Sequence, residues 1–305
     1  MTRKVELAIV GDVHLAFGPA DVRTLDAHGY DAILFVGDLS GYGEAGGLEV
    51  ARVIATLRTP AFVIPGNHDA VHVSQLGAEV LESDRVVDAL ERVPAVRSQE
   101  QRVEALARAL RAETGRGAIL GGYSRHRLEP TDAPPIDLVI GRPHSMGGPR
   151  LAFRPYLARA FGVHDLAASA DRLDAVLREC TAERVVVLAH NGPLGLGARK
   201  TDMFGCDFRA SEGDFGDPDL RDALDRARAR GQQIAAVVAG HMHHRVRGGG
   251  KRPMQRELDG TLIVNAARVP RVITRQGREL RHHVRLTLEA DGRVHAEEVL
   301  APSDA

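Results

Sequence analysis

Short apolar runs that end in polar residues of metal-ligand type constrain this sequence more than any other feature. Strand-type runs occur at 5–10, 32–36, 61–64, 185–189, 234–239 and 261–264. Between several of them lie segments with apolar residues at three- and four-residue spacing, which predict helices at 21–28, 48–57, 166–180 and 217–230. Strands that alternate with helices predict an α/β fold, in which layers of helices cover β-sheets.

The C-terminal part of the chain follows a different pattern. Residues 283–288 and 293–300 largely alternate apolar and polar positions on either side of Asp291-Gly292. This alternation around a turn is typical of an antiparallel hairpin. We therefore predict mixed β-sheets, with antiparallel strands late in the chain.

The middle of the chain, residues 70–183, does not continue the early pattern. Residues 86–111 are charged and helical in their spacing, and residues 115–149 are rich in Gly, Pro, Arg and His. We predict a single domain over residues 1–305, in which residues 70–183 form an insertion of helices and a long loop. This insertion is a candidate cap over the substrate.

Composition excludes several classes of partner. Forty Lys and Arg residues balance 41 Asp and Glu residues, for a net charge of −1, so no global positive field attracts nucleic acid or an anionic membrane. No apolar run reaches the roughly 18 residues of a membrane span. Two cysteines, Cys180 and Cys206, are too few for a disulfide framework and fit a reducing compartment. We expect a cytoplasmic protein with no membrane partner and no stable nucleic-acid binding; the oligomeric state is not predicted.

Five of the apolar runs end in residues that can bind a metal ion. The endings are Asp12 with His14, Asp38, Asn67 with His68 and Asp69, His190, and His241 with His243. In α/β sheets the carboxyl ends of strands form the common functional edge, so we expect these residues to converge. Each ending alone is typical of a turn, a hydrogen-bonded histidine or a surface loop. Independent turns do not explain the whole set, and we interpret it as a metal centre.

The ligand types indicate the metals and their chemistry. Oxygen and imidazole ligands without thiolates suit Mn²⁺, Fe or Zn²⁺, of which we favour Mn²⁺. Two divalent cations carry more charge than the carboxylates of Asp12 and Asp38 neutralise, so the centre attracts a phosphate. A hydroxide that bridges the two metals is the expected nucleophile. We predict that His68 protonates the leaving oxygen while Asp69 orients its ring; the alternative is a structural hydrogen bond between the two.

The order of these motifs resembles the calcineurin-like metallophosphoesterase superfamily. The matching blocks are Gly-Asp-Val-His at 11–14, Gly-Asp at 37–38, Gly-Asn-His-Asp at 66–69, His190, and Gly-His-Met-His at 240–243. Longer matches at 190–197, 240–244 and 265–267 resemble a bacterial and plastid subgroup, without specifying a substrate. The resemblance implies a four-layer αββα sandwich that holds two divalent metal ions. It assigns Asp12, His14 and His243 to one metal, Asn67, His190 and His241 to the other, and Asp38 to both.

Departures from the family patterns narrow the function. Protein phosphatases of this fold have an Asp-Arg pair beyond the bridging Asp and a Glu after Asn-His, whereas here Leu39-Ser40 follows Asp38 and Asp69 takes the place of the Glu. We predict a dinuclear hydrolase of small phosphate esters and favour phosphodiesters over phosphomonoesters. The alternatives are a phosphomonoesterase, a phosphoprotein phosphatase, a nuclease for single-stranded nucleic acid, or a scaffold without catalysis.

Substrate contacts are predicted from Asn67 and from one loop of the insertion. Arg142 and His144 lie close to Gly147-Gly148, in a loop that can approach a ligand. The guanidinium fork of arginine suits phosphate oxygens. We predict that Arg142 and His144 contact the substrate; the alternative is a solvated surface loop.

Overall fold

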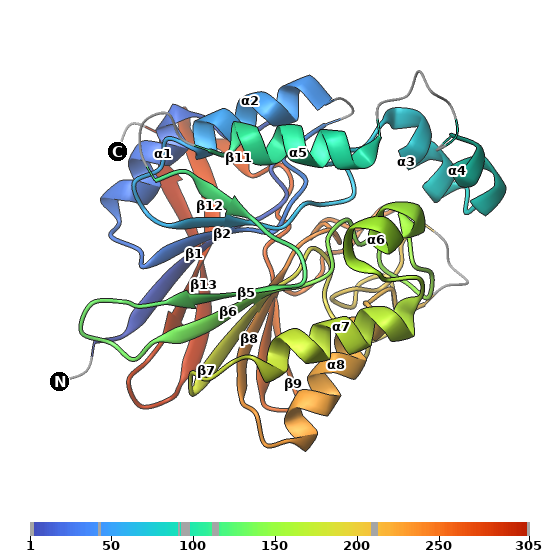
Figure 1. Ribbon diagram of the computed structural model, residues 1–305. Helices are drawn as coiled ribbons and strands as arrows, with labels where there is room; N and C mark the ends of the chain where they lie inside the picture. The colour runs from blue at the N-terminus through green and yellow to red at the C-terminus, as the bar shows by residue number, and fades with distance from the viewer. Residues whose placement is uncertain are drawn as a thin grey trace.

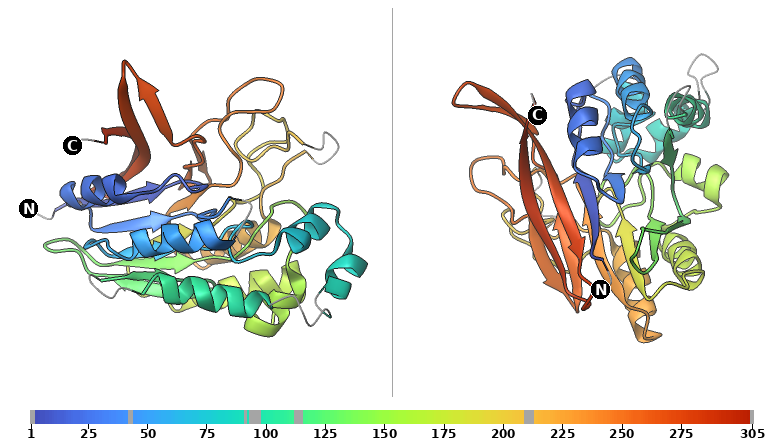
Figure 2. Two further views of the ribbon diagram at one scale, coloured as in Figure 1. Left: turned by 90° about the horizontal axis from the view of Figure 1, so that it is seen from above. Right: turned by 90° about the vertical axis from the view of Figure 1, so that its left-hand side faces the viewer.

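The computed structural model describes residues 3–303 except 42–43, 91, 93–97, 112–115 and 209–212. Its strands form two mixed sheets, and both ends of the chain lie on one side of the molecule (Figures 1 and 2). None of the helices in these residues combines the length and apolar character needed to cross a membrane.

The first sheet joins the two ends of the chain. Its strands, in spatial order, are β11 (Val272–Arg275), β12 (Arg278–Leu288), β1 (Val5–Val10), β2 (Ala32–Phe35), β3 (Ala61–Val63) and β4 (Ala118–Leu120), and β13 (Val294–Pro302) also pairs with β12. Strands β1 to β4 run parallel, whereas β12 runs antiparallel to β1. The predicted C-terminal hairpin is confirmed as β12–β13, which forms one side of the molecule (Figure 2, right, red).

The second sheet has a parallel centre and antiparallel edges. Its strands, in spatial order, are β5 (Ser124–Leu128), β6 (Ile136–Ile140), β7 (Arg184–Leu188), β8 (Ile234–Ala239), β10 (Thr261–Asn265) and β9 (Gln255–Leu258). Strands β6, β7, β8 and β10 are parallel to one another, and β5 and β9 are antiparallel to their neighbours. The prediction of mixed sheets is confirmed.

Helices cover the outer face of each sheet (Figure 1). Helices α1 (Pro19–Ala27), α2 (Glu44–Ile54) and α5 (Gln99–Ala109) pack on the first sheet, and α7 (Leu166–Arg178) and α8 (Pro218–Ala229) pack on the second. Three buried clusters correspond to these contacts, two between a sheet and its helices and one between the sheets. The four-layer αββα sandwich is therefore confirmed.

Strand β1 illustrates why the parallel strands appear in the sequence as continuous apolar runs. Leu7 and Ile9 lie in the cluster between the sheets, whereas Ala8 and Val10 lie in the cluster beneath the helices. Both faces of the strand are buried, so polar residues have no solvated face to occupy. The strand ends where the polar residues of the functional edge begin.

Residues 70–183 contain more regular structure than predicted. Helices α3 (Val73–Val80), α4 (Asp84–Leu90) and α6 (Arg154–Phe161) lie here together with α5 and α7, but β4 joins the first sheet and β5 and β6 join the second. The part of 115–149 that the structure describes thus contains three strands, β4, β5 and β6, in the region where a long loop was expected. Strand β5 was missed because it is polar: its Arg125 pairs with Asp137 of β6 at 2.8 Å. The description of 70–183 as an insertion in a single domain stays a prediction.

Candidate metal centre

The structure brings the seven predicted ligands together at the carboxyl ends of five strands. Asp12 and His14 follow β1, Asp38 follows β2, Asn67 follows β3, His190 follows β7, and His241 and His243 follow β8. Three of these strands belong to the first sheet and two to the second. The site therefore lies where the functional edges of the two sheets meet.

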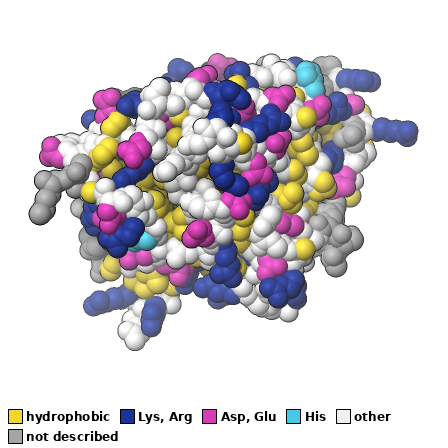
Figure 3. Space-filling model, turned by 90° about the horizontal axis from the view of Figure 1, so that it is seen from below, with side chains coloured by type: hydrophobic (Ala, Val, Ile, Leu, Met, Phe, Trp, Pro, Cys, Tyr) yellow, Lys and Arg dark blue, Asp and Glu magenta, His cyan; other side chains and the backbone are white. Residues whose placement is uncertain are grey.

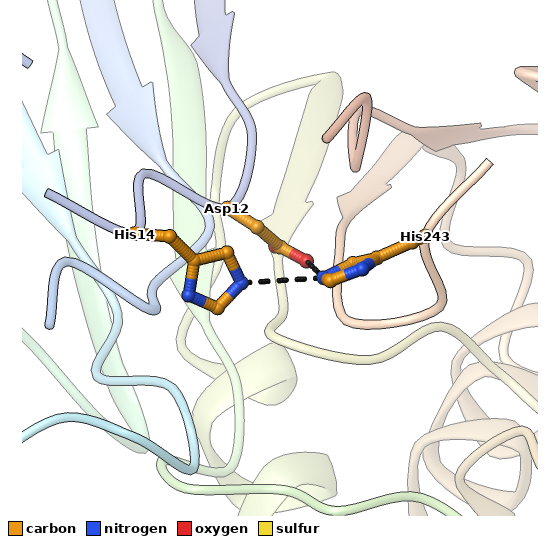
Figure 4. Close-up of side chains that lie close together, drawn as sticks. All are labelled: Asp12, His14 and His243. Carbon is orange, nitrogen blue, oxygen red and sulfur yellow. Dashed lines mark hydrogen bonds and ion pairs between the residues drawn. The ribbon is translucent and has the colours of Figure 1, made fainter. Parts of the chain in front are cut away.

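Asp12, His14 and His243 form one group (Figure 4). The Nε2 atoms of His14 and His243 lie 3.2 Å apart, and Nε2 of His243 lies 3.2 Å from Oδ2 of Asp12. Two imidazole nitrogens and a carboxylate oxygen thus point at one small volume. This donor set fits a divalent cation such as Mn²⁺ or Zn²⁺.

Asp38, His190 and His241 form the second group. Oδ1 of Asn67 lies 3.0 Å from Nε2 of His190 and 3.0 Å from Nδ1 of His241. The Asp38 carboxylate reaches both groups, because Oδ1 lies 3.6 Å from His190 Nε2 and Oδ2 lies 3.8 Å from His14 Nε2. This position fits the bridging role that the family resemblance implies.

Backbone carbonyl groups orient three of the histidines. Nδ1 of His190 donates to the Val36 carbonyl at 2.6 Å, and Nδ1 of His14 faces the Ser40 carbonyl at 3.3 Å. Nε2 of His241 faces the Met146 carbonyl at 3.1 Å. Because a carbonyl only accepts, each neutral ring carries its proton on that outer nitrogen and directs the other nitrogen's lone pair into the site. The tautomers therefore fit metal ligation.

The loops that carry the ligands adopt unusual backbone conformations. His14, Asp38 and His241 have φ values of 40°, 51° and 65°, in the left-handed region that side chains other than glycine rarely enter. Strained residues of this kind cluster at functional sites. Gly37 has a φ of 101°, and a Cβ atom there would lie 2.5 Å from the nitrogen of Gly66. The loops after β2 and β3 are thus in direct contact, which brings Asp38 and Asn67 together.

The electrostatics of the site favour cations. Burial opposes ionisation of Asp12, but the hydrogen bond and charge of His243 hold the pKa of that carboxyl below its ordinary value. Burial likewise opposes ionisation of Asp38, and the charges of His190 and His68 lower its pKa. Burial, together with the charge of His190, lowers the pKa of His241 to about 3. Ionised carboxylates beside a neutral imidazole are the protonation states that a divalent cation requires.

His68 and Asp69 follow the predicted ligand Asn67, and each contacts a neighbouring loop. The backbone nitrogen of His68 donates to Oδ1 of Asp38 at 3.0 Å, and its Nδ1 faces the Gly41 carbonyl at 3.2 Å. Asp69 is fully buried and accepts from the backbone nitrogens of Ser40 and Gly66, both at 2.9 Å. Asp69 thus joins the loops after β2 and β3 through their backbone. The Gly41 carbonyl orients the ring of His68.

Arg142 and His144 occupy the interior behind the metal centre. Arg142 has a side chain that is 2% exposed and pairs with Asp217 at 2.9 Å and Asp219 at 2.8 Å. His144 is fully buried, and its Nδ1 donates to the Gly66 carbonyl at 2.9 Å. Burial lowers the pKa of His144 to about 4. These contacts argue against the predicted contact with substrate and indicate support of the loops instead.

The cavity at the metal centre has further walls that sequence reasoning missed. It has a volume of about 520 Å³, and its lining includes Asp207, Phe208, Arg245, Arg247 and Arg252 besides predicted site residues. The available signal was the group of arginines close behind the Gly-His-Met-His motif. The buried Arg252 donates through Nη1 to the carbonyl of the predicted ligand His243 at 2.7 Å.

Another cavity, of about 610 Å³, lies at the opposite ends of the parallel strands. Its lining includes Arg184, Ile234 and Thr261, the first residues of β7, β8 and β10. Neither of the metal-type clusters found in the described residues lies there. Both candidate metal-binding groups of the described residues lie at the carboxyl ends of the strands.

Comparisons with known proteins agree with this arrangement. The family model of the calcineurin-like phosphoesterases matches residues 5–245. One solved chain superimposes with a TM-score of 0.54 at 10% identity, covering 97% of this chain and 99% of that chain. A protein described as a predicted 5′-nucleotidase, from Staphylococcus aureus and in complex with α-ketoglutarate, gives a TM-score of 0.50 at 12% identity, covering 99% of this chain and 54% of that chain. At these identities the two structures show the shared fold alone. A search of curated proteins finds no match.

Proposed function

The chain belongs to the calcineurin-like phosphoesterase family of phosphoric ester hydrolases, and we propose that it cleaves small phosphate esters at a centre of two divalent metal ions. One observation carries the proposal: seven ligand-type side chains from five strands converge, and backbone carbonyls turn the lone pairs of three histidines inward. We favour a phosphodiester over a phosphomonoester as the substrate.

The proposed ligand sets follow the two side-chain groups. Asp12, His14 and His243 would hold one ion. Asn67, His190 and His241 would hold the other, and Asp38 would contact both. We favour Mn²⁺, with Fe and Zn²⁺ as alternatives, because the donors are oxygen and imidazole nitrogen. When bound, the ions would neutralise charge on the phosphoryl oxygens and lower the pKa of a water that attacks phosphorus.

His68 is the proposed general acid. It lines the cavity at the metal centre, and its backbone nitrogen is fixed by Asp38. The Gly41 carbonyl accepts from Nδ1, so a protonated ring presents the proton on Nε2 to the leaving oxygen. Asn67, a wall of the same cavity, is the proposed contact to the phosphoryl group.

Charge supports a small substrate. The exposed Arg245 and Arg247 line the cavity and suit an anion, while the face in Figure 3 shows side chains of both signs interspersed. A polyanion needs a continuous basic surface, and the net charge is −1. Neither Cys180 nor Cys206 takes part in a disulfide, which fits the cytoplasmic site of action that is part of this proposal.

Turnover of nitrophenyl phosphate esters tests the function. The metal-free protein is loaded with Mn²⁺ and assayed with a nitrophenyl phosphodiester and the corresponding monoester, with and without chelator. We expect chelator-sensitive hydrolysis, faster for the diester. Faster monoester hydrolysis would reverse the preferred substrate. Two bound ions without hydrolysis of either ester would favour the scaffold alternative.

A further inference from the structure

A second cavity adjoins the metal centre and shares its walls. It has a volume of about 440 Å³, and Asn67, His241, Phe208 and Arg247 line both cavities. Two of these four are proposed metal ligands. A group bonded to a phosphoryl at the metal centre therefore has a direct path into the second cavity.

The walls of the second cavity are largely apolar. The apolar residues that line it are Val80, Met146, Ala152, Phe208 and Phe215. Of the charged residues that line it, Glu79 and Arg150 pair with each other at 2.8 Å, and Glu82 and Arg247 line it as well. Burial of an apolar group of the ligand against these apolar residues is favourable.

Two phenylalanines form an aromatic corner in this cavity. Phe208 is 44% exposed, whereas Phe215 is buried, and their ring centroids lie 5.0 Å apart at an interplanar angle of 87°. The buried ring supports the exposed one in an edge-to-face contact. Phe208 therefore presents a ring surface that an aromatic ligand can stack on.

The position of Phe208 is coupled to the metal ligands. Its neighbour Asp207 accepts from the backbone nitrogen of Arg247 at 2.7 Å and pairs with Arg252 at 3.3 Å. Arg252 in turn donates to the carbonyl of His243. A chain of direct contacts thus holds the aromatic corner at a fixed place relative to the metal centre.

We propose that the substrate is a phosphate ester of a group with a flat aromatic ring, and that this ring stacks on Phe208 in the second cavity. The inference rests on the proposed function, which brings the phosphoryl group to the metals. Arg247 lies at the junction of the two cavities, where its charge faces the phosphate and its planar group suits the ring. The polarisable sulfur of Met146, which also lines this cavity, favours an aromatic neighbour.

Binding measurements distinguish the contribution of the aromatic ring to affinity from that of the phosphoryl group. The Mn²⁺-loaded protein is titrated calorimetrically with phenylphosphonate, cyclohexylphosphonate and methylphosphonate, at a pH where all three are dianions. We expect phenylphosphonate to bind at least about fivefold more tightly than methylphosphonate, the lower end of a base–aromatic stacking contribution. Cyclohexylphosphonate should lie between them, because it is apolar but cannot stack.

Two variants locate the effect. Phe208→Ala should bring the phenyl-to-methyl affinity ratio close to one. Ile119→Ala is the matched control, because Ile119 is 45% exposed, against 44% for Phe208, and lies on β4 outside this cavity. The control should keep the parent ratio, and melting temperatures check that both variants are folded.

The outcomes keep the two proposals distinct. Equal binding of phenyl- and methylphosphonate, or an unchanged ratio in Phe208→Ala, would overturn the ring site and leave the metal centre intact. Cyclohexylphosphonate binding as tightly as phenylphosphonate would overturn the aromatic assignment. Absence of binding by all three, together with absence of hydrolysis, would instead contradict the proposed function.

Discussion

Gly66 offers a sharp test of how closely the metal ligands are packed. A Cβ atom at this position would lie 2.2 Å from Oδ1 of Asp38, 2.5 Å from the Asp38 nitrogen and 2.6 Å from Cε1 of His190. The side chains of Asp38 and His190, both proposed ligands, would have to move away. The distance between the new Cβ atom and Oδ1 of Asp38 would have to increase from 2.2 Å to at least 3.0 Å. A misplacement of about 1 Å at a reacting centre costs on the order of 100-fold in rate, and overpacking costs about 1–3 kcal/mol of stability.

We therefore expect Gly66→Ala to lower kcat by about 100-fold and to weaken binding at the metal position made by Asp38, His190 and His241. The number of bound Mn²⁺ ions is measured by elemental analysis after dialysis, and the free energy of unfolding by denaturant titration. Gly77→Ala is the control. Gly77 lies within α3, and a Cβ atom there meets nothing within 4 Å. This variant should keep both ions and gain up to about 1 kcal/mol, because alanine favours a helix.

If Gly66→Ala retained both ions and the parent kcat, the close contacts around Asp38 and His190 would not control the site. If Gly77→Ala lost activity to the same extent, the effect would not be specific to the ligand loops. A loss of stability without a loss of metal would place the strain elsewhere in the fold.

Three further predictions concern single side chains. Asp38→Asn should weaken both metal positions, whereas Asn67→Ala should mainly weaken one; elemental analysis that finds two ions in Asp38→Asn and none in Asn67→Ala contradicts the ligand assignment. His68→Ala should keep both ions and lose about 10² to 10⁴ in kcat on alkyl esters but less on nitrophenyl esters, whose leaving group needs no proton; equal losses would exclude a general acid. Burial opposes ionisation of Asp137, but two backbone N–H groups and Arg125 hold its pKa below the ordinary value. The contribution of the ionised carboxylate to the free energy of unfolding is therefore present at neutral pH and is lost as the pH falls through the folded pKa. Asp137→Asn should thus cost about 2–3 kcal/mol at neutral pH, and a cost in urea titrations that did not shrink in acid would refute this.

The sequence was sufficient to predict the layers of the fold and the location of the centre. β1 and β8 have the predicted bounds. Both faces of these strands are buried, so their sequences are nearly continuous apolar runs whose ends are easy to locate. The polar residues that follow the strands mark the functional edge. Neither prediction required knowledge of which strands are neighbours.

Long-range polar pairs limited what the sequence could predict elsewhere. Strand β5 contains Arg125 and Arg127, and charged residues of this kind are more typical of a loop. In the fold, Asp137 of the neighbouring strand forms an ion pair with each of them. Arg142 was predicted to contact phosphate because of its place in a glycine-containing loop. In the fold it pairs with Asp219, which is 77 residues away in sequence. Burial of a charged side chain depends on such partners, and their pairing is decided by the tertiary fold.

The contacts of His68 and Asp69 also depend on the tertiary fold. Adjacent residues in an extended or turning backbone direct their side chains apart, and Asp69 joins the backbone of two loops while His68 faces the Gly41 carbonyl. The same kind of group, a backbone carbonyl, orients His14, His190 and His241. Every residue has such a carbonyl, so the sequence does not identify which of them act. The candidate ligands of this centre could therefore be predicted from side-chain identities, whereas the tautomers that suit them to bind a metal depend on loop geometry.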